Sequence, residues 1–471
     1  MRRVERRRVL SWAATLLVAF TLVGWAVTCA PPVGVQAAQS GAATQPGRAG
    51  QPKPVTIRFW NWWDGERKPW MDKVIEEFQK EYPWITVKSE IQGWTDVGGK
   101  IMSAFAAGVP PEVMMARRMD VFALADLDAI IPITDLVKRD NIDLSMFYPG
   151  EANAFWYDGE LWTLPLPTVG LNDSFYMYNK ELFEQAGLDP ERPPQTWSAV
   201  LEANRKLTRR DGGGRITQLG FRAWPSQFIP FLYSNNGTFL SADLRRVTFN
   251  SPEGMEAADF LGQLVKMNNP AQQQDFLTRN EPDIGRAFIN GKEATIFENI
   301  SIMNVVLEHA KQTKRRLDWF GVGLMPYNEK NPKARSTGVS GLSYGWGYVI
   351  PKGLPKEKEE AAWLFVKFLT TDPRGSGYFM LMQGRPSPVR KFNEAPEFRK
   401  LNPVFDRLLM VLETEVPFPA IPVQKELVDL GVNSFWSVIS GTVEPREAVA
   451  RAAEQAQAVL DRYWQTRVKR R

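Results

Sequence analysis

The 471-residue sequence has a single cysteine and a single histidine. Beyond Cys29 no second thiol remains, so an oxidising compartment would find nothing to cross-link. The lone histidine, His309, argues against a Ser-His-Asp triad and against a histidine-rich metal site. The chain also lacks a phosphate-binding loop and a dinucleotide fingerprint, and we therefore expect no cofactor.

The net charge outside the N-terminus is small. The first 29 residues contain five arginines and one glutamate, so without them the formal charge falls from +5 to +1. A nearly neutral folded part gives no argument for binding nucleic acid.

The N-terminal arginines precede an apolar run, Val9 to Val27, which is the layout of an export signal. The run ends close to Cys29 in a pattern similar to a bacterial lipoprotein signal, and we expect this cysteine to be lipidated. Cleavage at the small residues near Ala37 and an uncleaved membrane anchor are alternatives. Residues 30–54 are rich in Ala, Gly, Pro, Gln and Ser without apolar spacing, which predicts a flexible tether.

Tryptophan is abundant, at 17 residues, and three tryptophans fall within four positions of the segment Phe59–Glu66. The segment follows a β-like run, Val55–Phe59, and ends in two carboxylates. Sugar rings stack their C–H faces on indole, and their hydroxyls need polar partners. The segment therefore indicates a carbohydrate site, although a tryptophan-rich corner of the core would use the same residues.

Short β-like runs alternate with amphipathic helical patterns from Val55 onward. Met71, Val74, Ile75 and Phe78 share one face of a predicted helix. The order strand, helix, strand, helix, strand predicts an α/β fold with a parallel sheet covered on both faces. Ligands gather at the carboxyl ends of the strands in such sheets.

Several short motifs then occur in a recognisable order. They are the aromatic-ended first strand, Ala106–Val113, Asp158–Glu160 with Leu164–Pro165, Tyr178–Phe183, Phe288 with Gly291–Ala294, and Pro351 ahead of the helix at Ala361–Trp363. In this order the chain resembles, from Val55 to the C-terminus, the bacterial extracellular solute-binding protein family 1. Members of this maltose-binding-protein-like class are carbohydrate receptors of ABC importers.

The resemblance implies a type II periplasmic-binding-protein-like fold, in which two hinged α/β lobes enclose a ligand cleft. Lobe 1 would comprise residues 55–170 and 345–372, and lobe 2 residues 171–344 and 373–471. The chain would cross between the lobes near 168–173 and near 339–346. A third crossing is expected after the helix that ends at Thr371.

The resemblance also assigns candidate ligand contacts to the strand ends and crossings. They are Trp62, Trp63, Asp64, Trp94, Arg117, Arg118, Asn172, Asp173, Trp224, Glu298, Asn299, Tyr344, Trp346 and Trp436. Strand alternation separates Trp62 from Trp63, and we expect the neighbouring Trp60 to lie in the core. We interpret Arg385 as structural.

Two adjacent arginines, Arg117 and Arg118, follow the third predicted strand. Two guanidiniums facing a cleft would suit a carboxylate or sulfate substituent on a sugar. The alternative is that they are solvated or pair with Asp120.

The resemblance implies an extracytoplasmic, monomeric receptor without catalytic activity. It would bind a mono- to oligosaccharide between its lobes and deliver it to a permease driven by a separate ATPase. Three alternatives remain open: a glycoside hydrolase that uses Asp64 and Glu66, a receptor for a non-sugar solute such as a polyamine or an anion, and a structural surface protein.

Overall fold

The computed structural model describes residues 53–172, 174–283, 285–342 and 345–470, and the side chains of 468–470 are not described. The predicted export signal with Cys29, nearly all of the predicted tether, and the candidate contacts Asp173 and Tyr344 lie outside the described residues. Within these ranges, none of the helices combines the length and the apolar character needed to cross a membrane.

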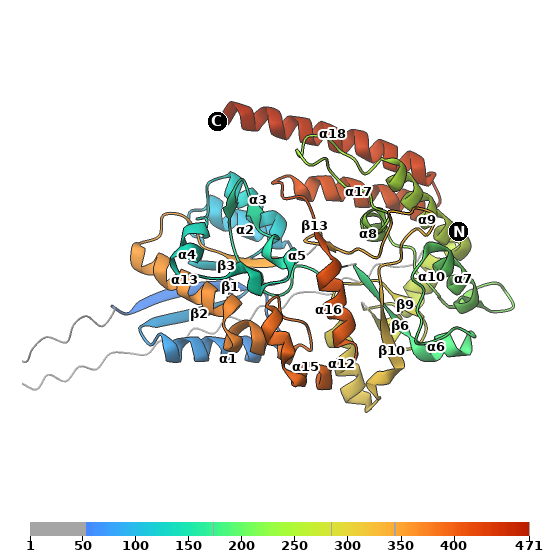
Figure 1. The fold of residues 1–471 in the computed structure, drawn as a ribbon, viewed down its shortest axis with the longest axis horizontal. Coiled ribbons are helices and arrows are strands. Elements are labelled where there is room, and N and C mark those ends of the chain that lie inside the picture. The colour runs from blue at the N-terminus through green and yellow to red at the C-terminus, as the bar shows by residue number, and fades with distance from the viewer. Residues whose placement is uncertain (1–52, 173, 284, 343–344, 471) are drawn as a thin grey trace, which may run out of the picture. The chain divides into compact units, whose positions relative to one another are not determined.

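The first lobe is built on a four-stranded sheet in the order β12-β3-β1-β2 (Figure 1). Its strands are β1 (Val55–Asn61), β2 (Ile85–Ile91), β3 (Val113–Arg117) and β12 (Trp346–Val349). The first three strands are parallel, as the sequence pattern predicts, and β12 runs antiparallel to β3. The carboxyl ends of β1, β2 and β3 therefore meet at one edge of the sheet.

Helices cover both faces of this sheet (Figure 1). Helix α1 (Arg67–Glu81) buries Met71, Val74, Ile75 and Phe78, the face predicted from their spacing. The other elements of the lobe are α2 (Val97–Ala106), α3 (Arg118–Asp126), α4 (Thr134–Arg139), α5 (Pro149–Ala152), β4 (Trp156–Tyr157), β5 (Glu160–Leu161), α13 (Lys356–Thr371), α14 (Tyr378–Met382) and α15 (Pro396–Leu401).

The second lobe contains a three-stranded antiparallel sheet in the order β10-β6-β9. Its strands are β6 (Phe175–Asn179), β9 (Thr295–Ile296) and β10 (Phe320–Leu324). Around it lie α6 (Lys180–Gln185), α7 (Trp197–Leu207), β7 (Arg209–Arg210), β8 (Ile216–Gln218), α8 (Phe228–Ser234), α9 (Pro252–Asn268), α10 (Pro270–Asn280), α11 (Arg286–Ile289), α12 (Ile302–Thr313), β11 (Val339–Ser340), α16 (Phe405–Thr414), β13 (Val416–Pro417), α17 (Gln424–Ile439) and α18 (Pro445–Arg470).

The hydrophobic cores show where the chain passes between the lobes. Val169 packs in the core of the first lobe and Leu171 in that of the second, so the chain passes from one core to the other between these residues. Leu342 packs in the core of the second lobe and Trp346 in that of the first, so the chain also passes between the cores from Leu342 to Trp346. The third crossing differs from the prediction, because side chains as far along as Phe405 still pack in the first core. The residues after 372 therefore stay with the first lobe for about thirty positions more, as α14 packs against α1.

Helix α18 packs along α9 and α17 of the second lobe (Figure 1). Near its C-terminal end it also reaches the first lobe. The hydroxyls of Tyr463 and Tyr157 lie 3.0 Å apart, and Arg467 pairs with Asp158 at 2.8 Å. This long helix therefore contacts both lobes.

Candidate functional site

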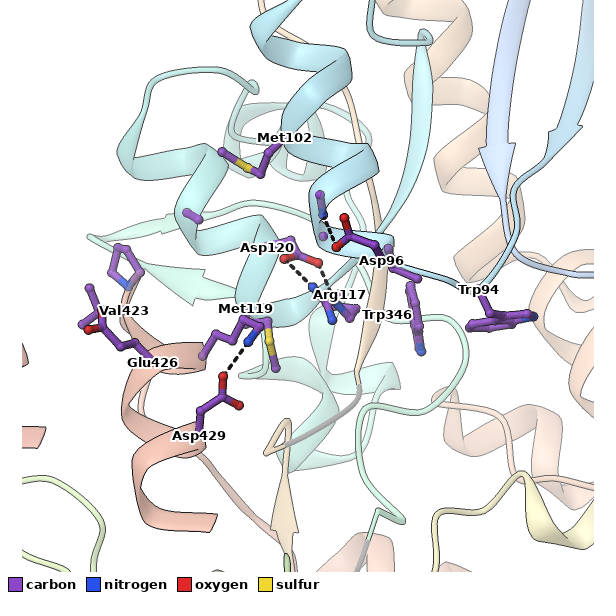
Figure 2. Close-up of a pocket in the computed structure, with 16 residues that line it drawn as sticks. Trp94, Asp96, Met102, Arg117, Met119, Asp120, Trp346, Val423, Glu426 and Asp429 are labelled. Carbon is purple, nitrogen blue, oxygen red and sulfur yellow. Dashed lines mark hydrogen bonds and ion pairs between the residues drawn. The ribbon is translucent and has the colours of Figure 1, made fainter. Parts of the chain in front are cut away.

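Two adjoining cavities lie at the carboxyl edge of the first sheet, where the two lobes face each other. Their volumes are about 830 and about 320 Å³, and Trp94 and Trp346 line both. The larger cavity lies between α2 and α3 of the first lobe and α17 of the second. Figure 2 shows Trp94 and Trp346 next to each other at one end of it and Glu426 and Asp429 of α17 at the other.

The two shared tryptophans stand at a right angle to each other. Their ring centroids are 5.8 Å apart with an interplanar angle of 84°. Behind Trp346 lies the fully buried Trp62, at 5.8 Å, whose indole N–H donates to the Gly93 carbonyl. Trp94 is 41% exposed, so its ring is the part of this wall most open to a ligand. Trp62 supports the wall from the core side.

Asp64 holds two residues of the smaller cavity in place. One of its oxygens accepts a hydrogen bond from the Trp94 indole at 3.0 Å, and the other accepts from Arg67 at 2.8 Å. The Arg67 guanidinium lies 5.4 Å from the Trp94 ring and 5.5 Å from the Trp63 ring, which suits cation–π attraction. Asp64 is therefore placed to position Trp94 and Arg67 and does not itself line either cavity.

The smaller cavity brings together five of the predicted contacts from both lobes. They are Trp63, Trp94, Asn172, Asn299 and Trp346. Asn172 and Asn299 form an antiparallel backbone bridge, which joins the first crossing to the segment before α12. The Asn172 side chain donates to the Val169 and Gly170 carbonyls.

Arg385, which we had interpreted as structural, also lines the smaller cavity. Its side chain is 5% exposed, and its guanidinium Nε has no hydrogen-bond partner in the described structure. The Thr168 hydroxyl, in the same cavity, is buried without a partner as well. Burial and the nearby Arg67 charge lower the pKa of Arg385 to about 9. A cation and a hydroxyl are therefore available to a ligand here.

The two adjacent arginines do not face the cleft together, which corrects the sequence prediction. Arg117 lines the larger cavity and forms an ion pair with Asp120 at 2.6 Å, the alternative considered above. Arg118, the first residue of α3, is 2% exposed because its side chain lies among Ala154, Gly341, Phe418 and Gln424. Its guanidinium donates to protein groups there, including Gln424 of α17.

The remaining predicted residues lie outside both cavities. Trp224 and Trp436 pack against each other in the second lobe, with ring centroids 4.8 Å apart. Glu298 precedes Asn299 but does not line either cavity. Trp60, expected in the core, is only partly buried and donates to Glu90 at 2.5 Å.

The two carboxylates of the hydrolase alternative do not converge. Asp64 bonds to Trp94 and Arg67, whereas Glu66 lines a separate cavity of about 730 Å³ beside Trp70 and Leu307. Nor do any three His, Cys, Asp or Glu side chains within the described ranges come together in a way that could hold a metal ion.

Comparisons with known proteins agree with this architecture. A curated relative, the sn-glycerol-3-phosphate-binding periplasmic protein UgpB of Shigella dysenteriae serotype 1, is 26% identical over 431 residues, which cover 87% of this chain and 93% of the relative. The corresponding protein of Escherichia coli K12 is 25% identical with the same coverage.

Solved structures show the same two-lobed fold. The sugar-binding protein MalE from Xanthomonas citri superposes with a TM-score of 0.72 at 19% identity, covering 88% of this chain and 99% of that one. A solute-binding protein from Thermotoga lettingae bound with α-D-tagatose gives 0.68 at 24% identity, covering 86% and 99%. The profile of the family described as bacterial extracellular solute-binding protein matches residues 63–373. The chain therefore belongs to the bacterial extracellular solute-binding protein family.

Proposed function

We propose that this protein is the binding component of an ABC importer and holds a carbohydrate in the two joined cavities. The observation that carries this proposal is the indole wall of Trp94 and Trp346, which both cavities share, with amide and hydroxyl groups around the smaller one. Stacking surface beside polar groups is what a sugar ring needs. The solved relatives that bind sugars support the same ligand class.

Contacts from both lobes give the binding event a mechanical consequence. A ligand in the smaller cavity would touch Trp94 of the first lobe and Asn299 of the second. Because such a ligand gains its full contacts only when the lobes approach, it favours the closed state. A permease can recognise that closed shape, and a separate ATPase would then supply the energy for transport.

We further propose that the protein works outside the cytoplasm as a monomer. The expected lipid on Cys29 and the tether of residues 30–54 would keep it at the outer face of the membrane. Cleavage near Ala37 would instead release it. Mass spectrometry of the mature N-terminus separates the two outcomes, because only the first leaves a lipid-modified cysteine.

Trp94→Ala is expected to weaken sugar binding about tenfold, since a stacked aromatic contact contributes roughly 1.5 kcal/mol. Titration calorimetry with a panel of mono- and oligosaccharides measures this directly. The control is Trp84→Ala, because Trp84 precedes β2 at the opposite edge of the sheet. Unchanged affinity in Trp94→Ala would refute the stacking role, and release of reducing sugar from any panel member would favour a hydrolase.

A second ligand class, an anion-bearing solute such as a phosphorylated polyol, is favoured by Arg385. Its guanidinium is buried beside Arg67, no ion pair is found for it in the described part of the chain, and its Nε is free to donate. Charge-assisted bonds to phosphate or carboxylate oxygens would use that donor. The curated relatives named for binding sn-glycerol 3-phosphate support this class.

Arg385→Gln separates the two classes. If the ligand is anionic, we expect the affinity for sn-glycerol 3-phosphate to fall between about tenfold and about 100-fold, because a hydrogen bond to a charged group contributes roughly 1.5–3 kcal/mol. Calorimetry on this variant measures the change. The matched control is Arg399→Gln, which replaces an exposed arginine that pairs with Asp406. Absence of heat with sn-glycerol 3-phosphate in the wild type, together with binding of a neutral sugar, would remove the anionic class.

A further inference from the structure

Two buried carboxylates hold the first crossing between the lobes. Glu151 of α5 is 1% exposed and Glu415, between α16 and β13, is 5% exposed. Glu151 accepts from the backbone N–H of Val169 at 2.7 Å and of Gly170 at 2.8 Å, one with each oxygen. One oxygen of Glu415 accepts from the N–H of Leu171 at 2.7 Å. Three consecutive amides of the crossing are thus bound by two acids.

The two acids reach the crossing from different elements that pack on each other. Helix α16, which ends just before Glu415, carries apolar side chains of the second-lobe core, whereas α5 leads into Ala154 and Phe155 of the first-lobe core. Gly170 makes the close approach possible, because a Cβ at this position would come within 1.7 Å of the outer oxygen of Glu415. The backbone therefore runs directly over this carboxyl group.

Among the described residues, no cation pairs with either acid. Neither acid forms an ion pair with any described residue, and Glu151 is the ionisable group whose charge acts on Glu415. The other neighbours of Glu415 are the hydroxyl residues Ser174 and Ser340, Gly338, and the apolar Leu412 of α16. Its outer oxygen Oε2 is buried without a hydrogen-bond partner.

The protonation of the pair follows from this environment. Burial raises the pKa of Glu151 to about 7, against the opposing effect of its two amide bonds. Burial also raises the pKa of Glu415 to about 8, where the Leu171 amide opposes the shift and the neighbouring Glu151 charge adds to it. Like charges in a space of low polarity cannot both ionise without penalty.

We propose that Glu151 and Glu415 share one proton near neutral pH and that loss of this proton to solvent loosens the crossing and shifts the balance between lobe arrangements. With one proton bound, the pair carries a single charge that three amide donors stabilise. With no proton bound, the pair carries two negative charges, which repel each other while the same three amide donors have to stabilise both. The proposal concerns the crossing itself and holds whichever ligand occupies the cleft.

Glu415→Gln tests the proposal, because an amide keeps an oxygen for the Leu171 N–H but cannot ionise. An acid whose pKa is higher in the folded than in the unfolded state stabilises the folded protein fully at a pH below its unfolded-state pKa. This stabilisation is lost as the pH rises through the folded-state pKa. Between about pH 6 and about pH 9 the wild type should therefore lose about 3 °C more in melting temperature than Glu415→Gln. The control, Glu413→Gln, removes an exposed acid near the end of α16, two residues before Glu415, and should follow the wild type.

Solution scattering of the ligand-free protein over the same pH range provides the conformational readout. We expect the radius of gyration of the wild type to change with a midpoint near pH 8 and that of Glu415→Gln to stay constant. Equal pH dependence in both proteins would overturn the proposal. Should Glu415→Gln fail to fold, carbon-13 spectra of the wild-type glutamate carboxyls decide alone: a carboxyl that titrates near pH 8 supports the shared proton, and its absence refutes it.

Discussion

Replacing Arg118 with leucine is expected to lower the free energy of unfolding by about 5 kcal/mol, since it removes a buried cation and leaves several buried acceptors without donors. The guanidinium donates to the carbonyl of Ala154 at 2.5 Å in the first lobe. It also donates to the Phe418 carbonyl and to the Gln424 side chain, each at 2.6 Å, and to the Gly341 carbonyl at 3.3 Å. One side chain thus links the first lobe, the second crossing and α17.

The surroundings of Arg118 favour arginine at this position. Its carbon chain lies so close to Gly341 that a Cβ there would meet the arginine Cδ at 2.5 Å, and its guanidinium lies 4.6 Å from the Phe122 ring. Burial lowers the pKa of Arg118 to about 9, so the cation depends on these acceptors. Lysine presents one compact ammonium instead of a planar fork, and Arg118→Lys should recover only part of the loss.

Urea unfolding followed by linear extrapolation measures the effect of Arg118→Leu. The matched control is Arg446→Leu, which breaks an exposed ion pair with Asp259 and should change stability by about 1 kcal/mol or less. A loss in Arg118→Leu no larger than in this control would show that the buried contacts contribute little to the fold.

Glu151→Gln is expected to destabilise the protein by about 3 kcal/mol at neutral pH. Both oxygens of Glu151 accept hydrogen bonds from backbone N–H groups. In the glutamine variant one of these oxygens becomes an NH2 group, so two donors would point at each other. Glu415 has only one oxygen engaged in this way, and its glutamine variant should lose much less. Urea unfolding measures the free energy of unfolding of both variants, and each variant serves as the control for the other.

Equal losses in Glu151→Gln and Glu415→Gln would contradict this account, because Glu151 binds two backbone amides and Glu415 binds one. We also expect Glu151→Asp to be less stable than the wild type, although it keeps the carboxylate. The shorter side chain would move both oxygens away from Val169 and Gly170.

Much of the fold follows from local sequence patterns. The β1–α1–β2 order and the buried face of α1 are encoded by apolar spacing, which acts over a few residues. Trp94, Asn172 and Trp346 were predicted as contacts, and the structure brings them to one cavity. Strand ends and crossings are positions that a family pattern identifies well.

What could not be predicted depends on partners that are distant in the chain. The burial of Trp62 beneath Trp346, the placement of Arg118 beside Gln424 and the burial of the unpartnered Arg385 Nε arise only when separate segments meet. Adjacent residues in sequence, such as Arg117 and Arg118, can point to different surroundings because α3 begins between them. No local signal marks a buried arginine that lacks an acidic partner.

The contact of α18 with the first lobe has a consequence for how the lobes can move. Arg118 fixes one point shared by both lobes, and the Tyr157–Tyr463 contact with the Arg467–Asp158 pair fixes a second. A rigid rotation that preserves two fixed points must take place about the line through them. A rotation of the lobes about that line would keep both attachments, whereas twisting out of that path requires the C-terminal helix to release the first lobe.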